Sequence, residues 1–325
     1  MLYNGDLLNI QIVNSIIYLQ NTIVFILTLN FLTNVRLDYV IKLFICVIFL
    51  SSLRVLIEEP NQFFQLSIRW TERIEALFIG GVNNFALFNG LAFCFSFFYL
   101  KKGWIKVFLC LVFLVVIVLT MSRGALLGVI LAVFITAFYD TNRRTLRLLI
   151  KFASGLFFIG LSFLYFTGKL DSVIEIVKNR FFSLFTGEQE LNVFFSGRGS
   201  LFINIFERMK EAPLFQFLFG HGNGGISFFD PESNQDYETS HNILIDILYR
   251  NGIFILGIYI LVFIYIFLLF IKHRHKQRLA LFSTFVFFHL ELLVNPVLFA
   301  AQVGWIYSIF LGLFLMQNKL LVDEG

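Results

Sequence analysis

Charged residues are scarce in this sequence of 325 residues, and they make up only 14% of it. Hydrophobic residues account for 58% and aromatic residues for 18%, and the mean hydropathy is +0.82. A soluble domain of this length has too small an interior to bury so many apolar side chains, so lipid must surround most of the chain. The formal net charge is only +4 and the basic residues are scattered, so we expect no nucleic-acid partner.

Cysteine is also rare. Cys46, Cys94 and Cys110 all lie in apolar runs and form no CxxC pair. We therefore expect neither disulfides nor a thiolate metal site, and we predict that all three are small buried hydrophobic residues. The N-terminus lacks a basic segment, because Arg36 is the first basic residue, and this argues against a cleavable signal peptide. No Walker A loop is present, and we expect no cofactor.

Continuous apolar runs recur along the chain, and a helix needs roughly 20 residues to cross a bilayer. The predicted spans lie near residues 13–32, 39–57, 76–100, 104–120, 125–139, 148–166, 252–271, 279–294 and 297–316. The predicted fold class is therefore all-α. We expect a polytopic integral membrane protein of about nine transmembrane helices, forming a single membrane domain over residues 1–325.

Basic residues fall in every second connection between these runs, and the positive-inside rule makes those connections cytoplasmic. The long loop at 167–240, between spans six and seven, is then external, with the N-terminus outside and the C-terminus inside. In this loop we expect short amphipathic helices at 171–185 and 201–211. Ser240 is the predicted N-cap of a surface helix, after which Gly252 turns the chain into the membrane.

Two arginines on the external side are candidates for binding an anion. Arg123 lies in the tight turn Ser122-Arg123-Gly124 between two apolar runs, and Arg198 lies between two glycines in the long loop. A guanidinium matches phosphate oxygens bidentately, so the two arginines could hold a pyrophosphate. The alternatives are that Arg123 snorkels to lipid head groups and that Arg198 is an ordinary loop charge.

Two histidines of the polar loop are further candidates. His241 stands between Ser240 and Asn242 where the loop meets the surface helix, and an imidazole that titrates near 6.5 can act as a general base. The alternative is a capping or interfacial histidine. His221, in the turn Phe219-Gly220-His221-Gly222, is a weaker candidate for substrate binding, because such a turn needs only its glycines.

Other ionisable residues are less informative. His273 and His275 alternate with Lys and Arg, which makes a cation site there improbable. His289 and Glu291 lie inside a predicted span, where they could be functional or a buried structural pair. The acidic residues between 230 and 238 lack EF-hand spacing and are predicted to form a solvated loop, and we expect no metal site.

The order of these motifs resembles the O-antigen ligase and Wzy-type polysaccharide polymerase superfamily. The resemblance rests on Ser122-Arg123-Gly124-Ala125, on Gly197-Arg198-Gly199 with the 219–222 turn after it, and on Ser240-His241-Asn242-Ile243-Leu244 followed by Gly252. A further element is Arg73 followed by Asn83-Asn84 at the outer end of the third span. The resemblance covers about residues 69–271.

The resemblance implies a bacterial cytoplasmic-membrane enzyme of the GT-C type with its active site on the external, periplasmic side. Such an enzyme is an inverting, metal-independent glycosyltransferase. Its donor is a glycan on polyprenyl (undecaprenyl) pyrophosphate, and its acceptor is a sugar hydroxyl on a glycan or lipid-linked glycan. Arg123 and Arg198 would then hold the pyrophosphate and His241 would activate the acceptor, while Arg73, Asn84 and His221 would bind substrate.

A carrier is the alternative from another class, such as a flippase or transporter of lipid-linked glycans. Carriers tend to have internal repeats and polar residues near the middle of the membrane. This sequence shows no repeat, and its candidate residues gather at one face, so the enzyme is the favoured interpretation. Polymerase and ligase differ only in the acceptor, which the sequence does not identify.

Overall fold

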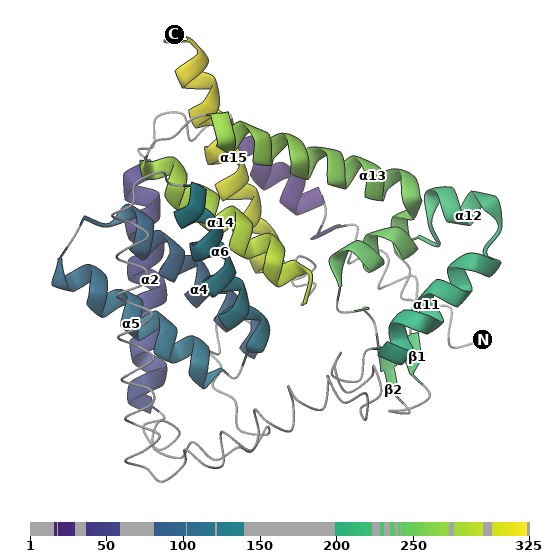
Figure 1. Cartoon of the computed structure of the whole chain (residues 1–325), viewed down its shortest axis with the longest axis horizontal. Helices are drawn as coiled ribbons and strands as arrows, with labels where there is room; N and C mark the ends of the chain where they lie inside the picture. The colour runs from purple at the N-terminus through teal and green to yellow at the C-terminus, as the bar shows by residue number, and fades with distance from the viewer. Residues whose placement is uncertain are drawn as a thin grey trace.

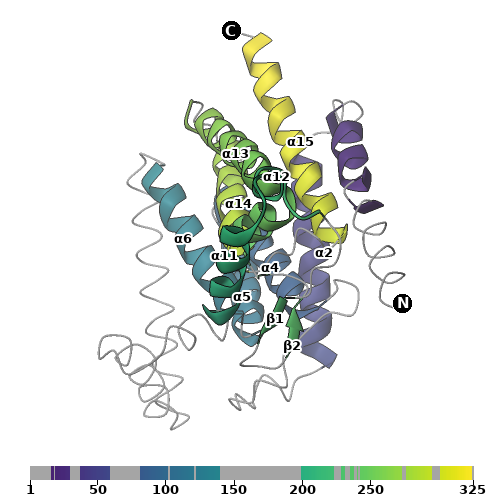
Figure 2. The ribbon, with the colours of Figure 1, turned by 90° about the vertical axis from the view of Figure 1, so that its right-hand side faces the viewer.

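The chain is helical over most of the residues that the computed structural model describes, with one short hairpin between two of the helices. The described residues are 16–17, 19–29, 37–58, 81–101, 103–120, 122–139, 199–222, 228–230, 235–237, 240, 242–272, 276–294 and 301–323. Figures 1 and 2 show a bundle of long helices with the shorter elements gathered on one side of it, beside one end of α13.

The long helices account for most of the described chain. They are α2 (Leu37–Glu58), α4 (Val82–Tyr99), α5 (Trp104–Leu119), α6 (Arg123–Tyr139), α13 (Ile243–Lys272), α14 (Lys276–Leu292) and α15 (Ala301–Asp323). The shorter elements are α11 (Gly199–Glu211), α12 (Leu214–Phe219), β1 (Phe228–Asp230) and β2 (Gln235–Tyr237).

Three of the described helices are long and apolar enough to cross a membrane, namely Leu37–Glu58, Val82–Tyr99 and Ile243–Phe270. Shorter apolar helices are Leu19–Leu29, Trp104–Leu119, Gly124–Tyr139, Leu279–Leu292 and Val303–Leu315. Each of these helices coincides with or overlaps a predicted span, which confirms a helical membrane protein. The predicted span at 148–166 and the predicted helix at 171–185 lie outside the described residues, and the total of nine spans stays a prediction.

The hairpin departs from the all-α expectation. Strands β1 and β2 pair antiparallel, with Phe228 opposite Tyr237 and Asp230 opposite Gln235. Each strand has only three residues, too few for the alternation of apolar and polar residues that identifies a strand in a sequence. The acidic stretch predicted to be a solvated loop is therefore partly strand.

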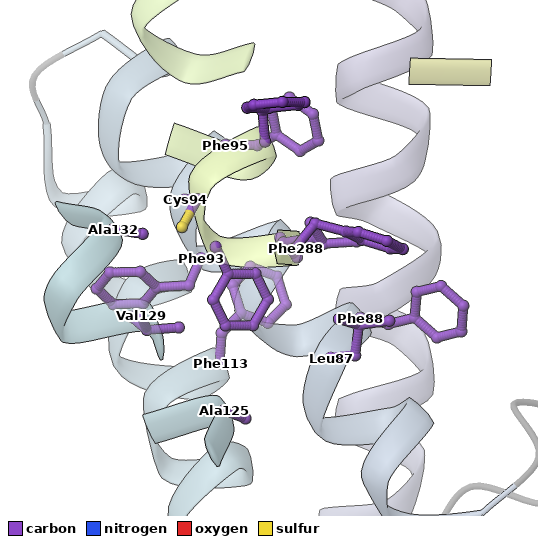
Figure 3. Close-up of a cluster of buried hydrophobic side chains, with 14 of the residues drawn as sticks. Leu87, Phe88, Phe93, Cys94, Phe95, Phe113, Ala125, Val129, Ala132 and Phe288 are labelled. Atoms are coloured by element: carbon purple, nitrogen blue, oxygen red, sulfur yellow. The ribbon is translucent and has the colours of Figure 1, made fainter. Parts of the chain in front are cut away.

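Helix α4 is the centre of the bundle. Every residue from Asn84 to Phe97 is buried, and α2, α5, α6 and α14 pack around it. Figure 3 shows the aromatic side chains that fill this core, with Phe93, Phe95 and Phe113 among them. One polar pair lies within it: the Ser52 hydroxyl donates to Asn89 Oδ1 at 2.7 Å, and Asn89 Nδ2 donates to the Phe85 carbonyl at 2.9 Å. Buried polar groups persist where they are bonded in this way.

Small residues let α4 and α6 approach α14 closely. A Cβ added to Gly90 of α4 would lie 2.1 Å from the Phe287 ring, and one added to Gly128 of α6 would lie 3.2 Å from the same ring. Phe287 is itself fully buried. Close helix contacts of this kind are typical of membrane bundles, in which van der Waals packing drives helix association.

The cysteine prediction is correct for two residues and wrong for the third. Cys94 and Cys110 are buried, whereas Cys46 is exposed. Cys46 lies on the face of α2 that also exposes Leu43, Val47 and Leu50. That face is turned away from the bundle, so an apolar neighbourhood in the sequence did not mean burial in the protein.

Candidate active site

The turn between α5 and α6 is closed by its own side chains. Thr120 ends α5, where its N–H donates to the Val116 carbonyl at 2.9 Å and its hydroxyl to the Ile117 carbonyl at 2.6 Å. Buried Ser122 begins α6, because its carbonyl accepts the Leu126 N–H at 3.1 Å and its hydroxyl faces the Ala125 N–H at 3.5 Å. Arg123 is thus the first residue of α6, and its side chain lies outside the described residues. The positive end of the helix dipole is at this position, which favours a bound anion.

Glu291 of α14 lies directly against this turn. Its carboxylate is fully buried, and its Oε2 would be 3.1 Å from a Cβ added to Gly124 and 3.9 Å from one added to Gly128. The Cγ1 atom of Val294 would be about as close, 3.0 Å from the Cβ added to Gly124. Because Gly124 has no side chain, the end of α14 can pack against it. The buried Glu291 carboxylate therefore lies beside the residue that follows Arg123.

The segment 240–242 is bonded to the same end of α14. Asn242 Nδ2 donates to the Leu293 carbonyl at 3.0 Å. Asn242 Oδ1 accepts the N–H groups of Leu244 and Ile245 at 3.0 and 3.3 Å, so Asn242 is the N-cap of α13. The prediction that Ser240 is the cap is wrong, because the helix begins two residues later than that role requires. The Ser240 hydroxyl instead bonds to the backbone of Asn242 at 2.9 and 3.2 Å.

Asp246 of α13 accepts a hydrogen bond from the backbone of Ser240. Its carboxylate is fully buried, and Oδ1 accepts the Ser240 N–H at 2.7 Å. Arg250, one turn further along α13, is also buried and lies within electrostatic reach of Asp246. His241 itself lies outside the described residues. The structure nevertheless fixes both of its neighbours, Ser240 through α13 and Asn242 through α14.

The 219–222 turn joins the kink of α13. Gly252 interrupts α13 with φ 79° and ψ 174°, so the carbonyls before it lose their usual partners within the helix. The N–H groups of His221 and Gly222 donate to two of these carbonyls, those of Tyr249 and Arg250, at 3.0 and 2.9 Å. The predicted change of direction at Gly252 is therefore present as a kink, and its direction into the membrane stays a prediction. The glycine turn supplies the donors that the kink requires.

His221 has several contacts in this turn. Its ring stacks on the Tyr249 ring with centroids 4.2 Å apart, and its Nδ1 lies 3.1 Å from the Tyr249 carbonyl oxygen. Tyr249 also packs against Ile205 and Met209 of α11. These contacts give His221 a structural role, and its contact with substrate stays a prediction.

The other predicted site residues are only partly described. Asn84 is buried in the first turn of α4. Arg73 and Arg198 lie outside the described residues, although Gly199, which follows Arg198, begins α11. The helix predicted at 201–211 is confirmed by α11, which begins two residues earlier. Among the described residues, no group of His, Cys, Asp and Glu could hold a metal ion.

His289 and Glu291 contact different helices, and sequence reasoning missed this difference. The Nε2 of His289 lies 3.3 Å from the Tyr307 hydroxyl of α15, and its Nδ1 lies 2.9 Å from the Phe285 carbonyl. Glu291 instead meets α6 at Gly124. The signal in the sequence was the spacing of Gly124 and Gly128, four residues apart, which is typical of a close helix contact.

An apolar cavity of about 320 Å³ lies between α13 and α14 and reaches the same end of these helices. Its lining includes Ile243, which follows Asn242, and Leu293, whose carbonyl accepts the Asn242 bond, and the cavity extends to Phe267 further along α13. Tyr259 and His289 bring the polar groups of its lining. The almost entirely apolar lining suits an apolar ligand.

Comparisons with known proteins identify one family. A family model described as O-antigen ligase matches residues 107–260. The match includes the turn at 122–124, the long loop and the 240–244 motif, while α14 lies outside it. A search of curated proteins finds no match. The match supports a role in polysaccharide and O-antigen assembly and suggests a glycosyltransferase-like enzyme in a bacterial membrane. The match confirms the resemblance that the motifs indicate, because residues 107–260 of this protein match the model of the O-antigen ligase family.

Proposed function

We propose that this protein transfers a glycan from polyprenyl (undecaprenyl) pyrophosphate to a sugar hydroxyl at the outer face of the bacterial cytoplasmic membrane. One observation carries the proposal. Two motifs that are far apart in the sequence, 122–124 and 240–242, both contact the segment 291–294 at one end of α14. We call this contact region the junction. Two of the three residues proposed for the chemistry, Arg123 and His241, belong to these motifs.

The reaction assigns one role to each residue. His241 takes the proton of the acceptor hydroxyl while the hydroxyl oxygen attacks the anomeric carbon of the donor sugar. The bond from that carbon to the pyrophosphate oxygen breaks, and the leaving pyrophosphate gains negative charge. Arg123 and Arg198 stabilise this charge as it develops, and such preorganised electrostatic stabilisation is often the largest catalytic contribution. A single displacement of this kind inverts the anomeric carbon and requires no metal ion.

The cavity between α13 and α14 supports a lipid-linked donor. We assign it to the isoprenoid chain, because its lining is almost entirely apolar and it begins beside the junction. A chain in this cavity would leave its pyrophosphate at the N-terminal end of α6, where Arg123 begins the helix. Arg73, Asn84 and His221 remain our proposed contacts to the sugars.

The experiment that tests this function is transfer by the purified protein in proteoliposomes that contain the lipid-linked donor. Arg123→Lys and Arg198→Lys should each lose most of the activity, because an ammonium cannot replace a bidentate phosphate contact. Arg54→Lys is the matched control, since Arg54 is half exposed on α2 and pairs with Glu58 at 2.7 Å. Full activity in both site variants at normal protein levels would contradict the proposed roles.

The sidedness of the site has its own test. A cysteine at position 235, in the external loop, should react with an impermeant thiol reagent in intact cells, in a Cys46→Ala background. A cysteine at position 277, in the first turn of α14, should react only after the cells are opened. The reverse pattern would place the long loop in the cytoplasm and would remove the proposal for an outer-face enzyme.

Deletion of the gene then separates the acceptors. Loss of a polymerase should leave single repeat units on their final carrier, whereas loss of a ligase should leave long chains on the lipid. A carrier without enzymatic activity would instead leave the purified protein inactive with donor and acceptor on the same side of the membrane. Glycan analysis by gel distinguishes these outcomes.

A further inference from the structure

Helix α12 exposes large apolar side chains on nearly all of its surface. Its six residues, Leu214 to Phe219, are apolar except for Gln216, and none of them is buried. The exposed fractions are 73% for Leu214, 71% for Phe215 and 53% for Phe219. A soluble surface rarely carries such a contiguous apolar patch, so something other than water covers it.

The patch is continuous with the exposed apolar side of α13. The Phe215 and Phe219 rings are 5.1 Å apart, and Phe219 is 6.5 Å from Phe254. Phe254 is 60% exposed and lies just after the Gly252 kink, at the start of the strongly apolar part of α13. That part of α13 belongs to a candidate membrane span in which an 18-residue apolar window is only 11% buried in the protein. The surface that covers Phe254 therefore also reaches α12.

The helix is attached to the kink too closely to move independently. Gly220, which ends α12, would place an added Cβ 2.1 Å from the Arg250 carbonyl oxygen. Gly252 would place one 2.2 Å from the Leu218 carbonyl oxygen. Backbone therefore meets backbone at both glycines, and Figure 1 shows α12 beside the kinked end of α13. Helix α12 and the kink of α13 consequently lie at the same depth relative to the membrane surface.

The charges on either side define that depth. Helix α11 carries exposed Glu207, Arg208, Lys210 and Glu211 just before α12. Residues 251–270 of α13, after the kink, carry no charge. A segment with charge on one side and a membrane span on the other lies where water meets hydrocarbon, and aromatic side chains are enriched at that level.

We propose that α12 binds the lipid surface, with Leu214, Phe215 and Phe219 inserted among the outer acyl chains and Phe254 continuing the contact. This contact fixes the turn at 220–222, and with it the start of the polar loop, at the level of the lipid head groups. The proposal concerns membrane contact alone and is independent of glycosyl transfer.

Spin labels on the full-length protein test this inference in vesicles of phosphatidylethanolamine and phosphatidylglycerol. Labels are placed at Leu214→Cys and Phe215→Cys, with Glu211→Cys as the matched control one turn away on α11, all in a Cys46→Ala background. Labels at 214 and 215 should be relaxed mainly by oxygen, which partitions into lipid. The label at 211 should be relaxed mainly by a water-soluble nickel chelate.

Two results would overturn the proposal. Strong relaxation by the nickel chelate at 214 and 215 would place α12 in water. Low accessibility to both relaxers would show that another protein surface covers it, such as a second copy of this chain. All three positions are exposed, so the labels should not disturb folding, and an unchanged size-exclusion profile checks this. The result involves neither donor nor acceptor, so it is separate from the outcome of the transfer assay.

Discussion

Gly220 and Gly222 offer a comparison that isolates the contact between α12 and α13. Both glycines have positive φ, 82° and 88°, and Gly220, with ψ 177°, lies in a region that essentially only glycine adopts. Alanine at either position therefore costs about 1–3 kcal/mol of conformational energy. Only Gly220 also meets backbone, since its added Cβ would lie 2.1 Å from the Arg250 oxygen while Gly222 has nothing within 4 Å. A backbone atom cannot rotate away, and overpacking costs roughly 1–3 kcal/mol more. Gly220→Ala should therefore destabilise this region by about 2–6 kcal/mol, and Gly222→Ala by about 1–3 kcal/mol.

Limited trypsin digestion measures this difference locally. Arg208 and Lys210 are exposed on α11, which packs on Tyr249 through Ile205 and Met209. When α12 leaves the kink, α11 loses its neighbour, so cleavage after these two residues should accelerate strongly in Gly220→Ala. Gly222→Ala should be cleaved far more slowly. Equal cleavage rates in the two variants would show that the backbone contact does not hold the loop, and the reasoning from the glycine geometry would be refuted.

Three further predictions concern the site. Asn242→Asp keeps the capping oxygen but cannot donate to the Leu293 carbonyl, so the thermal midpoint should stay near wild type while turnover falls. Turnover equal to that of the wild type would show that the hydrogen bond to Leu293 is not needed for activity. If His241 is the general base, the transfer rate should rise with pH as the imidazole loses its proton, and His241→Ala should cost about 10²- to 10⁴-fold in turnover while donor binding remains; lost donor binding would instead make it a pyrophosphate ligand. Ile260→Trp, which fills the cavity between α13 and α14, should raise the KM for a long-chain donor more than for a short-chain analogue, whereas Leu261→Trp on the exposed face should change neither.

The long helices could be predicted from the sequence because each is a continuous apolar run, and such runs are the strongest signal in a membrane protein. Helix α11 was predicted for a related reason, since its apolar and charged residues alternate with helical period. Helix α12 could not be predicted. Its six residues are too few to show a period, and Pro213, which precedes the helix, is equally compatible with the end of α11.

The details of the site depend on contacts that no local pattern contains. Ser and Asn are both good N-caps, so the choice between Ser240 and Asn242 depended on where α13 begins, and helix boundaries are the least certain part of a sequence prediction. The approach of Glu291 to Gly124 joins residues on helices far apart in the chain. The sequence shows Gly124 in a tight turn and Glu291 inside an apolar run, yet only the packing of α6 against α14 shows that they meet.

The two neighbours of His241 are bonded to different helices, and this arrangement has a consequence for the site. Ser240 is held by Asp246 of α13, whereas Asn242 is held by the Leu293 carbonyl at the end of α14. The same two helices line the apolar cavity. Ser240 and Asn242 are therefore held by two different helices, and functional groups work best when rigid elements hold them. The spacing of α13 and α14 sets both the width of the cavity and the relative positions of Ser240 and Asn242, so the two cannot vary independently.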